Sequence, residues 1–290
     1  MSAIFILLTM TFLSLTTLSH ADDCDVEGCR CTQMEDTYSL DCYVSALTQA
    51  DLQMTSAISA KVTSLSLICY PSRRQSSLTS DLFGGFTTLE SLSLSQCNIS
   101  VVTSPLLLTS LRVLTISQCI LPTLDPNLLQ ELTRLENLTI AESGLTRLTR
   151  ISNLSSLRFL NLSSNFLTTL EPDTPELSGP AHPDTPALSG PAHPDPDTPE
   201  LSGPAHNDPD TPALSGPAHP NLTFIDLSYN QIKEFPVTLL RSSPQLQQLL
   251  LRRTSIKELS VPDDLDLRNL TVLDLSENRL DKVLLSSALM

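Results

Sequence analysis

The chain has 290 residues, 40% of them hydrophobic, and a formal net charge of -15 at pH 7. This length is enough to bury a sizeable core, and the acidic balance argues against nucleic acid and anionic membrane surfaces as partners. Much of the charge is local, because residues 171–220 hold nine acidic residues and no lysine or arginine.

The first stretch of the chain indicates export. Residues 4–18 are apolar or hydroxylated and uncharged, and they end in Ser19-His20-Ala21, with small residues where a signal peptidase cleaves. The sequence therefore predicts a signal peptide over residues 1–21 and a secreted chain beginning near Asp22. A retained membrane anchor is the alternative, and no later stretch is long enough to cross a bilayer.

Seven cysteines follow in two groups. Four of them, Cys24, Cys29, Cys31 and Cys42, lie close together within residues 22–61. Secretion permits disulfides, although four cysteines allow three connectivities; a zinc site is the less favoured alternative.

The second group comprises Cys69, Cys97 and Cys119. We expect Cys97 and Cys119 to be packed thiols, with a Cys69–Cys97 or Cys97–Cys119 bridge as the alternative.

An eleven-residue pattern, L-x-x-L-x-L-x-x-N-x-L, organises the rest of the chain. It is clearest in residues 157–167, and a weaker copy begins at Val62. The other copies begin at Leu89, Leu111, Leu135, Leu222, Leu246 and Leu270. The alternating leucines predict a short strand with one buried face in each copy. One such coil cannot bury its apolar face alone, so neighbouring coils stack and share a core.

The pattern resembles the leucine-rich repeat family, whose repeat length is roughly 20–29 residues. Together with the cysteine cluster, it is similar to the ectodomains of Toll-like receptors and to variable lymphocyte receptors. The resemblance implies an α/β leucine-rich repeat solenoid, curved, with a parallel β-sheet on its concave face. It also implies a cysteine-rich cap over residues 22–61 with bridges Cys24–Cys31 and Cys29–Cys42. The repeats would occupy residues 62–170 and 221–290, without a C-terminal cap.

A second, different repeat interrupts the solenoid at residues 171–220. Four copies of a proline-rich segment occur, at Pro172–His182, Pro183–His193, Pro196–His206 and Pro209–His219. One leucine per copy cannot build a core, so the sequence predicts a disordered insert that leaves the strands on both sides intact. The copied histidines raise the alternative of a metal site, which we disfavour because a flexible loop must first be ordered.

Residues between the buried leucines should project together from the concave face. On the later coils they include aromatic and arginine side chains, which are enriched in binding hot spots. The predicted ligand-binding residues are Phe224, Asp226, Tyr229, Gln248, Leu250, Arg252, Arg253 and Asp274. The alternative for Phe224 and Leu250 is that they only extend packing between strands.

Six N-x-S/T sequons predict glycosylation of an extracellular surface. They lie at Asn98, Asn137, Asn153, Asn161, Asn221 and Asn269. Glycans on Asn137 and Asn161 would cover the middle strands of the concave face.

The sequence shows no catalytic motif and no arrangement of residues for a metal or cofactor. We therefore expect a secreted, non-catalytic recognition protein that binds a protein, or a microbial glycan or lipid, in innate immunity or cell adhesion. Contact with a membrane would occur only through a partner. The alternatives are a matrix protein like the small leucine-rich proteoglycans and a truncated fragment of a membrane receptor.

Overall fold

The computed structural model describes most of the predicted solenoid. The described residues are 26–49, 52, 54–70, 74–102, 105–125, 127–148, 151, 154–169 and 219–284. The predicted signal peptide, Cys24, Asn153 and residues 170–218 of the insert region lie outside them.

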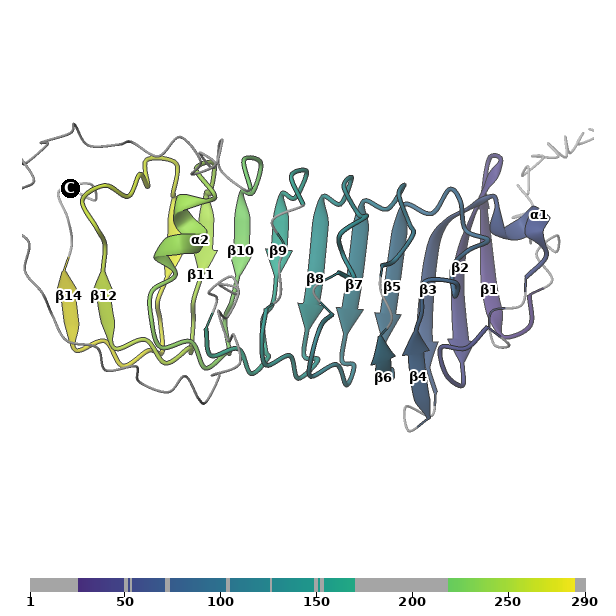
Figure 1. Cartoon of the computed structure of the whole chain (residues 1–290), viewed down its shortest axis with the longest axis horizontal. Helices are drawn as coiled ribbons and strands as arrows, with labels where there is room; N and C mark the ends of the chain where they lie inside the picture. Colours follow the sequence, from purple (N-terminus) through teal and green to yellow (C-terminus); the bar gives the residue numbers. More distant parts are fainter. Residues whose placement is uncertain are drawn as a thin grey trace, which may run out of the picture.

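One ten-stranded sheet runs along the whole molecule (Figure 1). Its strands, in spatial order, are β1 (Cys29–Met34), β2 (Thr37–Val44), β3 (Val62–Cys69), β5 (Ser91–Ser95), β7 (Val113–Ser117), β8 (Asn137–Ala141), β9 (Phe159–Asn161), β10 (Phe224–Asp226), β11 (Gln248–Leu250) and β13 (Val272–Asp274). All neighbours from β2 onward pair in parallel, one strand per coil. The predicted leucine-rich repeat solenoid is confirmed.

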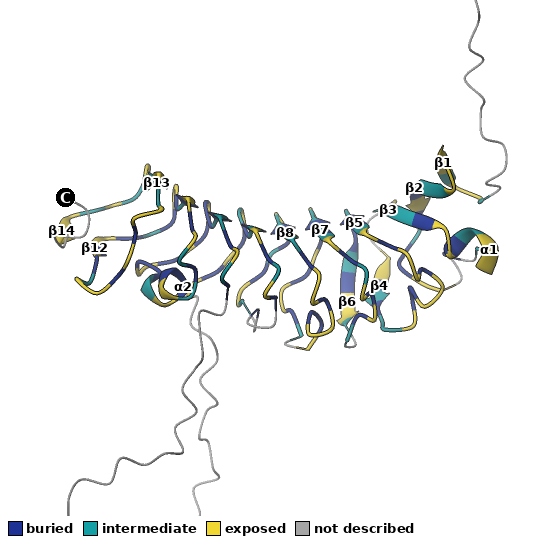
Figure 2. Cartoon of the chain, turned by 90° about the horizontal axis from the view of Figure 1, so that it is seen from above, coloured by how far each residue is buried: buried dark blue, intermediate teal, exposed yellow. Residues whose placement is uncertain are grey.

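Little helix accompanies the sheet. The helices are α1 (Ser56–Ser59) and α2 (Val237–Arg241), and two small sheets pair β4 (Gln75–Leu78) with β6 (Asn98–Val102) and β12 (Glu258–Ser260) with β14 (Lys282–Leu284). Seen from above, the strands lie along the inner side of a shallow arc (Figure 2). The strand face is therefore the concave face, as the sequence predicts.

The core is a stack of leucines. In β9, Leu160 is fully buried between two half-buried neighbours, and Leu162 just beyond the strand is also fully buried. The same alternation recurs in β5, β7 and β8. Each coil thus buries its leucines against those of its neighbours, which is how a solenoid stabilises repeats that are unstable alone.

From Ser143 onward, a column of buried or half-buried polar side chains closes the turns that follow the strands. In Asn165, Oδ1 accepts from the Ser143 and Leu145 N–H groups at 3.1 and 3.0 Å, and Nδ2 donates to the Ile140 and Leu162 carbonyls. Asn230 and Asn278 repeat this arrangement in their own coils. The asparagine of the pattern therefore satisfies backbone groups that the tight turn leaves without partners.

The N-terminal end of the sheet is a hairpin. Strands β1 and β2 are antiparallel, and the Cys29–Cys42 disulfide links two residues that face each other in the register. The predicted Cys29–Cys42 bridge is confirmed. Cys31 is also disulfide-bonded, whereas its predicted partner Cys24 lies outside the described residues.

The solenoid continues directly across the insert. Phe159, Leu160 and Asn161 of β9 pair in parallel with Phe224, Ile225 and Asp226 of β10. The prediction that the insert leaves both strands intact is confirmed.

The coil begins again before the predicted end of the insert at residue 220. His219 is buried, and its N–H donates to the Ser242 carbonyl at 2.9 Å. The last histidine of the proline-rich copies is thus part of the repeat that follows.

Candidate functional site

The concave face has two chemically different halves. On β5, β7 and β8 the half-buried or exposed positions carry mostly serine and threonine; they are Ser91, Ser93, Ser95, Val113, Thr115, Ser117, Asn137, Thr139 and Ala141. On β9 to β13 the equivalent positions carry Phe159, Asn161, Phe224, Asp226, Gln248, Leu250, Val272 and Asp274. Among β5 to β13, aromatic, apolar and charged side chains therefore occur together on the C-terminal coils. At the N-terminal end of the sheet, β2 also exposes Asp41 and Tyr43.

Phe224 contacts the neighbouring coil. Its ring stacks on Phe159, with centroids 4.3 Å apart and an interplanar angle of 2°. Phe224 therefore does extend packing between strands, which is the alternative given by the sequence. Both rings are only half-buried, so part of each remains accessible on the concave face. Phe159, which the predicted site omits, belongs to the same surface.

One residue in the turn that follows each strand from β5 to β13 lies in the left-handed region. Tyr229 and Arg253 occupy this position in consecutive coils, with φ of 59° and 50°. This conformation is uncommon for residues other than glycine, and it places both side chains at the rim of the concave face. The Arg253 guanidinium lies over the Tyr229 ring, 5.9 Å from its centroid, in a cation–π contact.

Arg252 is held by a carboxylate from the next coil. It forms an ion pair and a two-nitrogen contact with Glu277, and Glu277 together with Tyr229 and Asp274 raises the pKa of the guanidinium. The sequence predicts that Asp226 and Asp274 flank the arginines. The principal partner is instead Glu277, because it occupies the rim position one coil beyond Arg253.

The two predicted aspartates, Asp226 and Asp274, accept hydrogen bonds from backbone N–H groups of the turns that follow them. Oδ1 of Asp226 accepts from the Ser228 N–H, and Oδ1 of Asp274 from the Ser276 N–H, each at 2.9 Å. Hydrogen bonds from Ser276 are the main cause that lowers the pKa of the Asp274 carboxyl group, and the positive charge of Arg252 is a smaller one. Asp274 is therefore the predicted aspartate whose charge acts on Arg252, after that of Glu277.

Gln248 and Leu250 join these residues into one surface. The register sets Phe224 beside Gln248, and Leu250 between Asp226 and Asp274. Gln248 is exposed and Leu250 is half-buried. All eight predicted residues thus lie on coils that are direct neighbours.

The middle coils of the face, β5 to β8, offer a comparable ion pair but no aromatic group. Arg112 contacts Glu136 of the next coil at 3.2 Å. This pair has the same arrangement as Arg252 and Glu277, since each arginine bonds a glutamate one coil further on.

Five of the six predicted glycosylation sites lie among the described residues. Asn137, Asn221 and Asn269 are exposed, whereas Asn98 and Asn161 are half-buried. Oδ1 of Asn161 accepts from the Ser163 N–H, and Nδ2 of Asn221 and of Asn269 donate to backbone carbonyls of the preceding coil.

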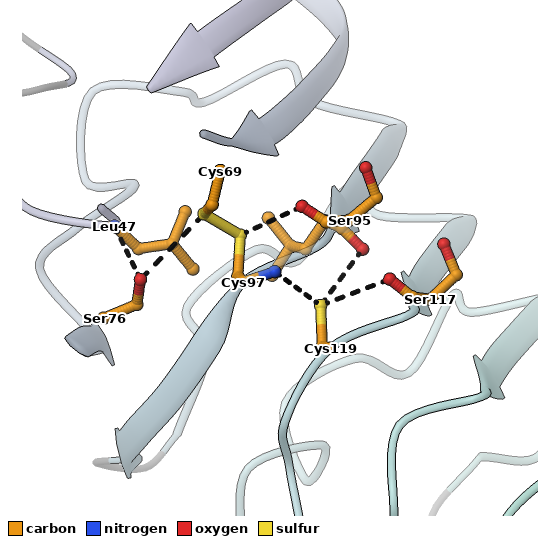
Figure 3. Close-up of a disulfide and its surroundings, with 8 residues drawn as sticks. Leu47, Cys69, Ser76, Ser95, Cys97, Ser117 and Cys119 are labelled. Carbon is orange, nitrogen blue, oxygen red and sulfur yellow. Dashed lines mark hydrogen bonds between the residues drawn. A yellow bond between two sulfur atoms is a disulfide. The ribbon is translucent and has the colours of Figure 1, made fainter. Parts of the chain in front are cut away.

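The expectation of a packed thiol at Cys97 is wrong. Cys97 forms a disulfide with Cys69 of the preceding coil (Figure 3). Cys119 is a free, buried thiol that lies one coil further on, and its Sγ accepts from the Cys97 N–H at 3.4 Å. The Cys69–Cys97 bridge, which the sequence offers only as an alternative, is the pairing present. The repeat pattern aligns Cys97 with Cys119, whereas Cys69 stands one position earlier in its own repeat.

No group of histidine, cysteine and acidic residues able to hold a metal ion occurs within the described coils. Across those same residues, no helix is long and apolar enough to cross a membrane.

Comparison with known proteins identifies the class. The model of the Leucine Rich Repeat family matches residues 156–177, 221–242 and 269–289. Together with the stacked coils described above, these three matched repeats identify the fold as a leucine-rich repeat solenoid. Such solenoids typically serve as binding scaffolds rather than as catalysts.

Solved structures agree on the fold. Among 178 matching chains is one from the crystal structure of the mouse RP105/MD-1 complex, with 18% sequence identity and a TM-score of 0.53. The match covers 82% of this chain and 34% of that one, so the chain spans about a third of its neighbour's length. No curated protein sequence matches the chain.

Proposed function

We propose that this chain is a secreted recognition protein that binds a protein ligand, without catalysis, in innate immunity or cell adhesion. Its binding site would be the C-terminal concave surface, defined as Phe224, Asp226, Tyr229, Gln248, Leu250, Arg252, Arg253 and Asp274. The observation that carries the proposal is the pairing of exposed Tyr229 and Arg253 at the rim, beside the Arg252 ion pair. Tyrosine and arginine are the side chains most often found at binding hot spots.

The contrast along the concave face supports this location. Small hydroxyl side chains on β5 and β7 offer little area and no charge, so they provide few anchors for a partner. On the later coils an apolar centre, formed by the Phe159–Phe224 stack and Leu250, is surrounded by both signs of charge. An apolar core with a polar rim is the usual composition of a protein interface.

The shape of this surface favours a protein over a small glycan or lipid. Small ligands bind in enclosed cavities that cover most of their surface. The C-terminal concave surface is an open row of strands, and the clefts near it lie beside the turns. The structural neighbour is itself named as a complex of two proteins, which is compatible with this choice.

Secretion is supported by the disulfides. Cys29–Cys42 and Cys69–Cys97 are bonds that persist in oxidising compartments and are rare in the cytosol. The predicted signal peptide and the six sequons agree with an extracellular location.

The test compares two substitutions in the C-terminal concave surface with one control substitution outside it. A partner is first captured on an array of extracellular proteins, and its affinity is then measured for the Tyr229→Ala, Arg252→Ala and Arg112→Ala variants. Tyr229→Ala and Arg252→Ala should each weaken binding by about 2 kcal/mol or more. Arg112→Ala removes the same type of ion pair from the other half of the face and should leave affinity unchanged. Equal affinities for all four proteins would refute the location.

A further inference from the structure

The basic residues of the C-terminal coils divide into two groups. Within residues 219–284, four of them form ion pairs with carboxylates: Arg241 with Asp264, Arg252 with Glu277, Arg268 with Asp266 and Lys282 with Glu258. The other four have no carboxylate partner among the described residues; they are Lys233, Arg253, Lys257 and Arg279.

All four unpaired cations line one cleft. The cleft has a volume of about 600 Å³ and lies beside the turns of the last three coils. Lys233 and Lys257 stand at equivalent positions of the repeat, eleven residues after Leu222 and Leu246. The Arg279 N–H donates to the Ile256 carbonyl, which places Arg279 next to Lys257. Stacking of coils thus brings together cations that are far apart in the sequence.

Three carboxylates lie in or near this cleft, and one of them, Glu277, already forms an ion pair. Glu277 also lines the cleft, but it is the partner of Arg252. Asp281 follows at the C-terminal end, where its N–H donates to the Lys257 carbonyl. Glu234 lies on the neighbouring cleft that Lys233 shares. Four cations without an ion pair thus line the cleft, against the two carboxylates nearby that also form none, and the cleft keeps an excess of positive charge.

We propose that this basic cleft binds a short sulfated sugar segment. Lysine and arginine are the usual donors to sulfate and phosphate oxygens, and a volume of about 600 Å³ is typical of small-ligand sites. The cation–π contact with Tyr229 helps to hold the Arg253 guanidinium in place.

The net negative charge of the chain favours a short sulfated sugar over longer polyanions. A net charge of -15 repels a long polyanion such as nucleic acid over distances greater than the cleft. A flat anionic membrane cannot enter a cleft beside the turns. A short sulfated oligosaccharide places its charge only where the cations are.

The proposal extends beyond the C-terminal concave surface and does not depend on it. The two sites share Arg253, whereas Lys233 and Lys257 belong only to the basic cleft. Substitution of these two lysines therefore tests the cleft alone.

The experiment measures binding of a size-defined heparin octasaccharide to the full chain by calorimetry at fixed salt. Lys233→Ala/Lys257→Ala should weaken binding by roughly tenfold or more. The slope of log affinity against log salt concentration should become smaller by about 2, one for each lysine removed. Lys233→Arg/Lys257→Arg should retain binding. The control Arg241→Ala/Arg268→Ala removes the same net charge from ion-paired positions and should bind like the parent.

Three comparisons decide the nature of the ligand. Fully desulfated octasaccharide should not bind, and inorganic sulfate should compete only at high concentration. A single-stranded oligonucleotide of equal charge, and vesicles containing phosphatidylserine, should bind more weakly than the octasaccharide. Equal losses in the two double-alanine variants, binding of the desulfated sugar, or tighter binding of the oligonucleotide or vesicles would each overturn the proposal.

Discussion

The ring of Phe224 lies flat on the ring of Phe159, although the whole proline-rich insert separates the two residues in the sequence. The stack exists because β9 and β10 are adjacent in the sheet and pair residue by residue. The coil on each side of the insert therefore continues the same solenoid, and the insert contributes no strand between them.

Deletion of residues 172–208 should leave this solenoid unchanged. The deletion keeps the last proline-rich copy and His219, and shortening a surface loop alters the closure free energy by only about 0.6 kcal/mol per halving. We expect a secreted variant that melts within a few degrees of the parent by circular dichroism.

A longer deletion, of residues 172–219, is the matched control. It removes the buried His219 and its hydrogen bond to Ser242, so it should lower the melting temperature clearly. Failure of the shorter deletion to fold would mean that the insert packs against the solenoid.

Asn165→Ala should destabilise the chain strongly. Asn165 is buried and bonds backbone groups of its own coil and of the preceding one, so its loss leaves several polar groups unsatisfied. The expected decrease in the free energy of unfolding is on the order of 3 kcal/mol. Denaturant titration measures it, with Asn127→Ala at an exposed turn as the control. A change no larger than that of Asn127→Ala would contradict the role of the buried column.

Disulfide mapping should recover Cys29–Cys42 and Cys69–Cys97 as separate bridges. Cys119 should react with an alkylating reagent only after unfolding, because the residue is buried and burial raises the pKa of its thiol. The thiolate is the reactive form, so native alkylation should be slow. Recovery of a Cys97–Cys119 bridge from native protein would show that the pairing is different.

The stability of the chain should depend on pH through His219. The ring is buried, and Nδ1 has no hydrogen-bond partner among the residues that the structure describes. Burial lowers the pKa of the side chain below 6.5 despite a bond to the Leu154 backbone. The unfolded chain then binds more protons than the folded one between these two pKa values. The free energy of unfolding should consequently fall as the pH drops below about 6.5 and level off below the folded pKa.

The measurement compares the parent with His219→Gln in denaturant titrations from about pH 7.5 to pH 5. Glutamine keeps a donor for the Leu154 carbonyl but does not titrate, so this variant should lose part of the pH dependence. Identical pH profiles for the two proteins would exclude His219 as the source.

The sequence alone determined the solenoid, because its evidence is local and repeated. Leu160 and Leu162 alternate as a half-buried strand must, and Asn165 stands at the turn where a short amide can bond free backbone groups. Each coil repeats the same requirement, so the pattern specifies strands, turns and stacking order. The Cys29–Cys42 bridge followed from resemblance to a known cap.

Only the tertiary structure decided which side chains meet between coils. The register determines that Phe224 stacks on Phe159, that Arg252 bonds Glu277 rather than an aspartate, and that Cys69 reaches Cys97. The Arg252–Glu277 and Cys69–Cys97 contacts join positions that differ by one residue within the repeat, so the pattern alone does not align them. The same stacking leaves Lys233 and Lys257 unpaired beside one cleft, because charge balance between coils depends on distance in space and not on position in the sequence.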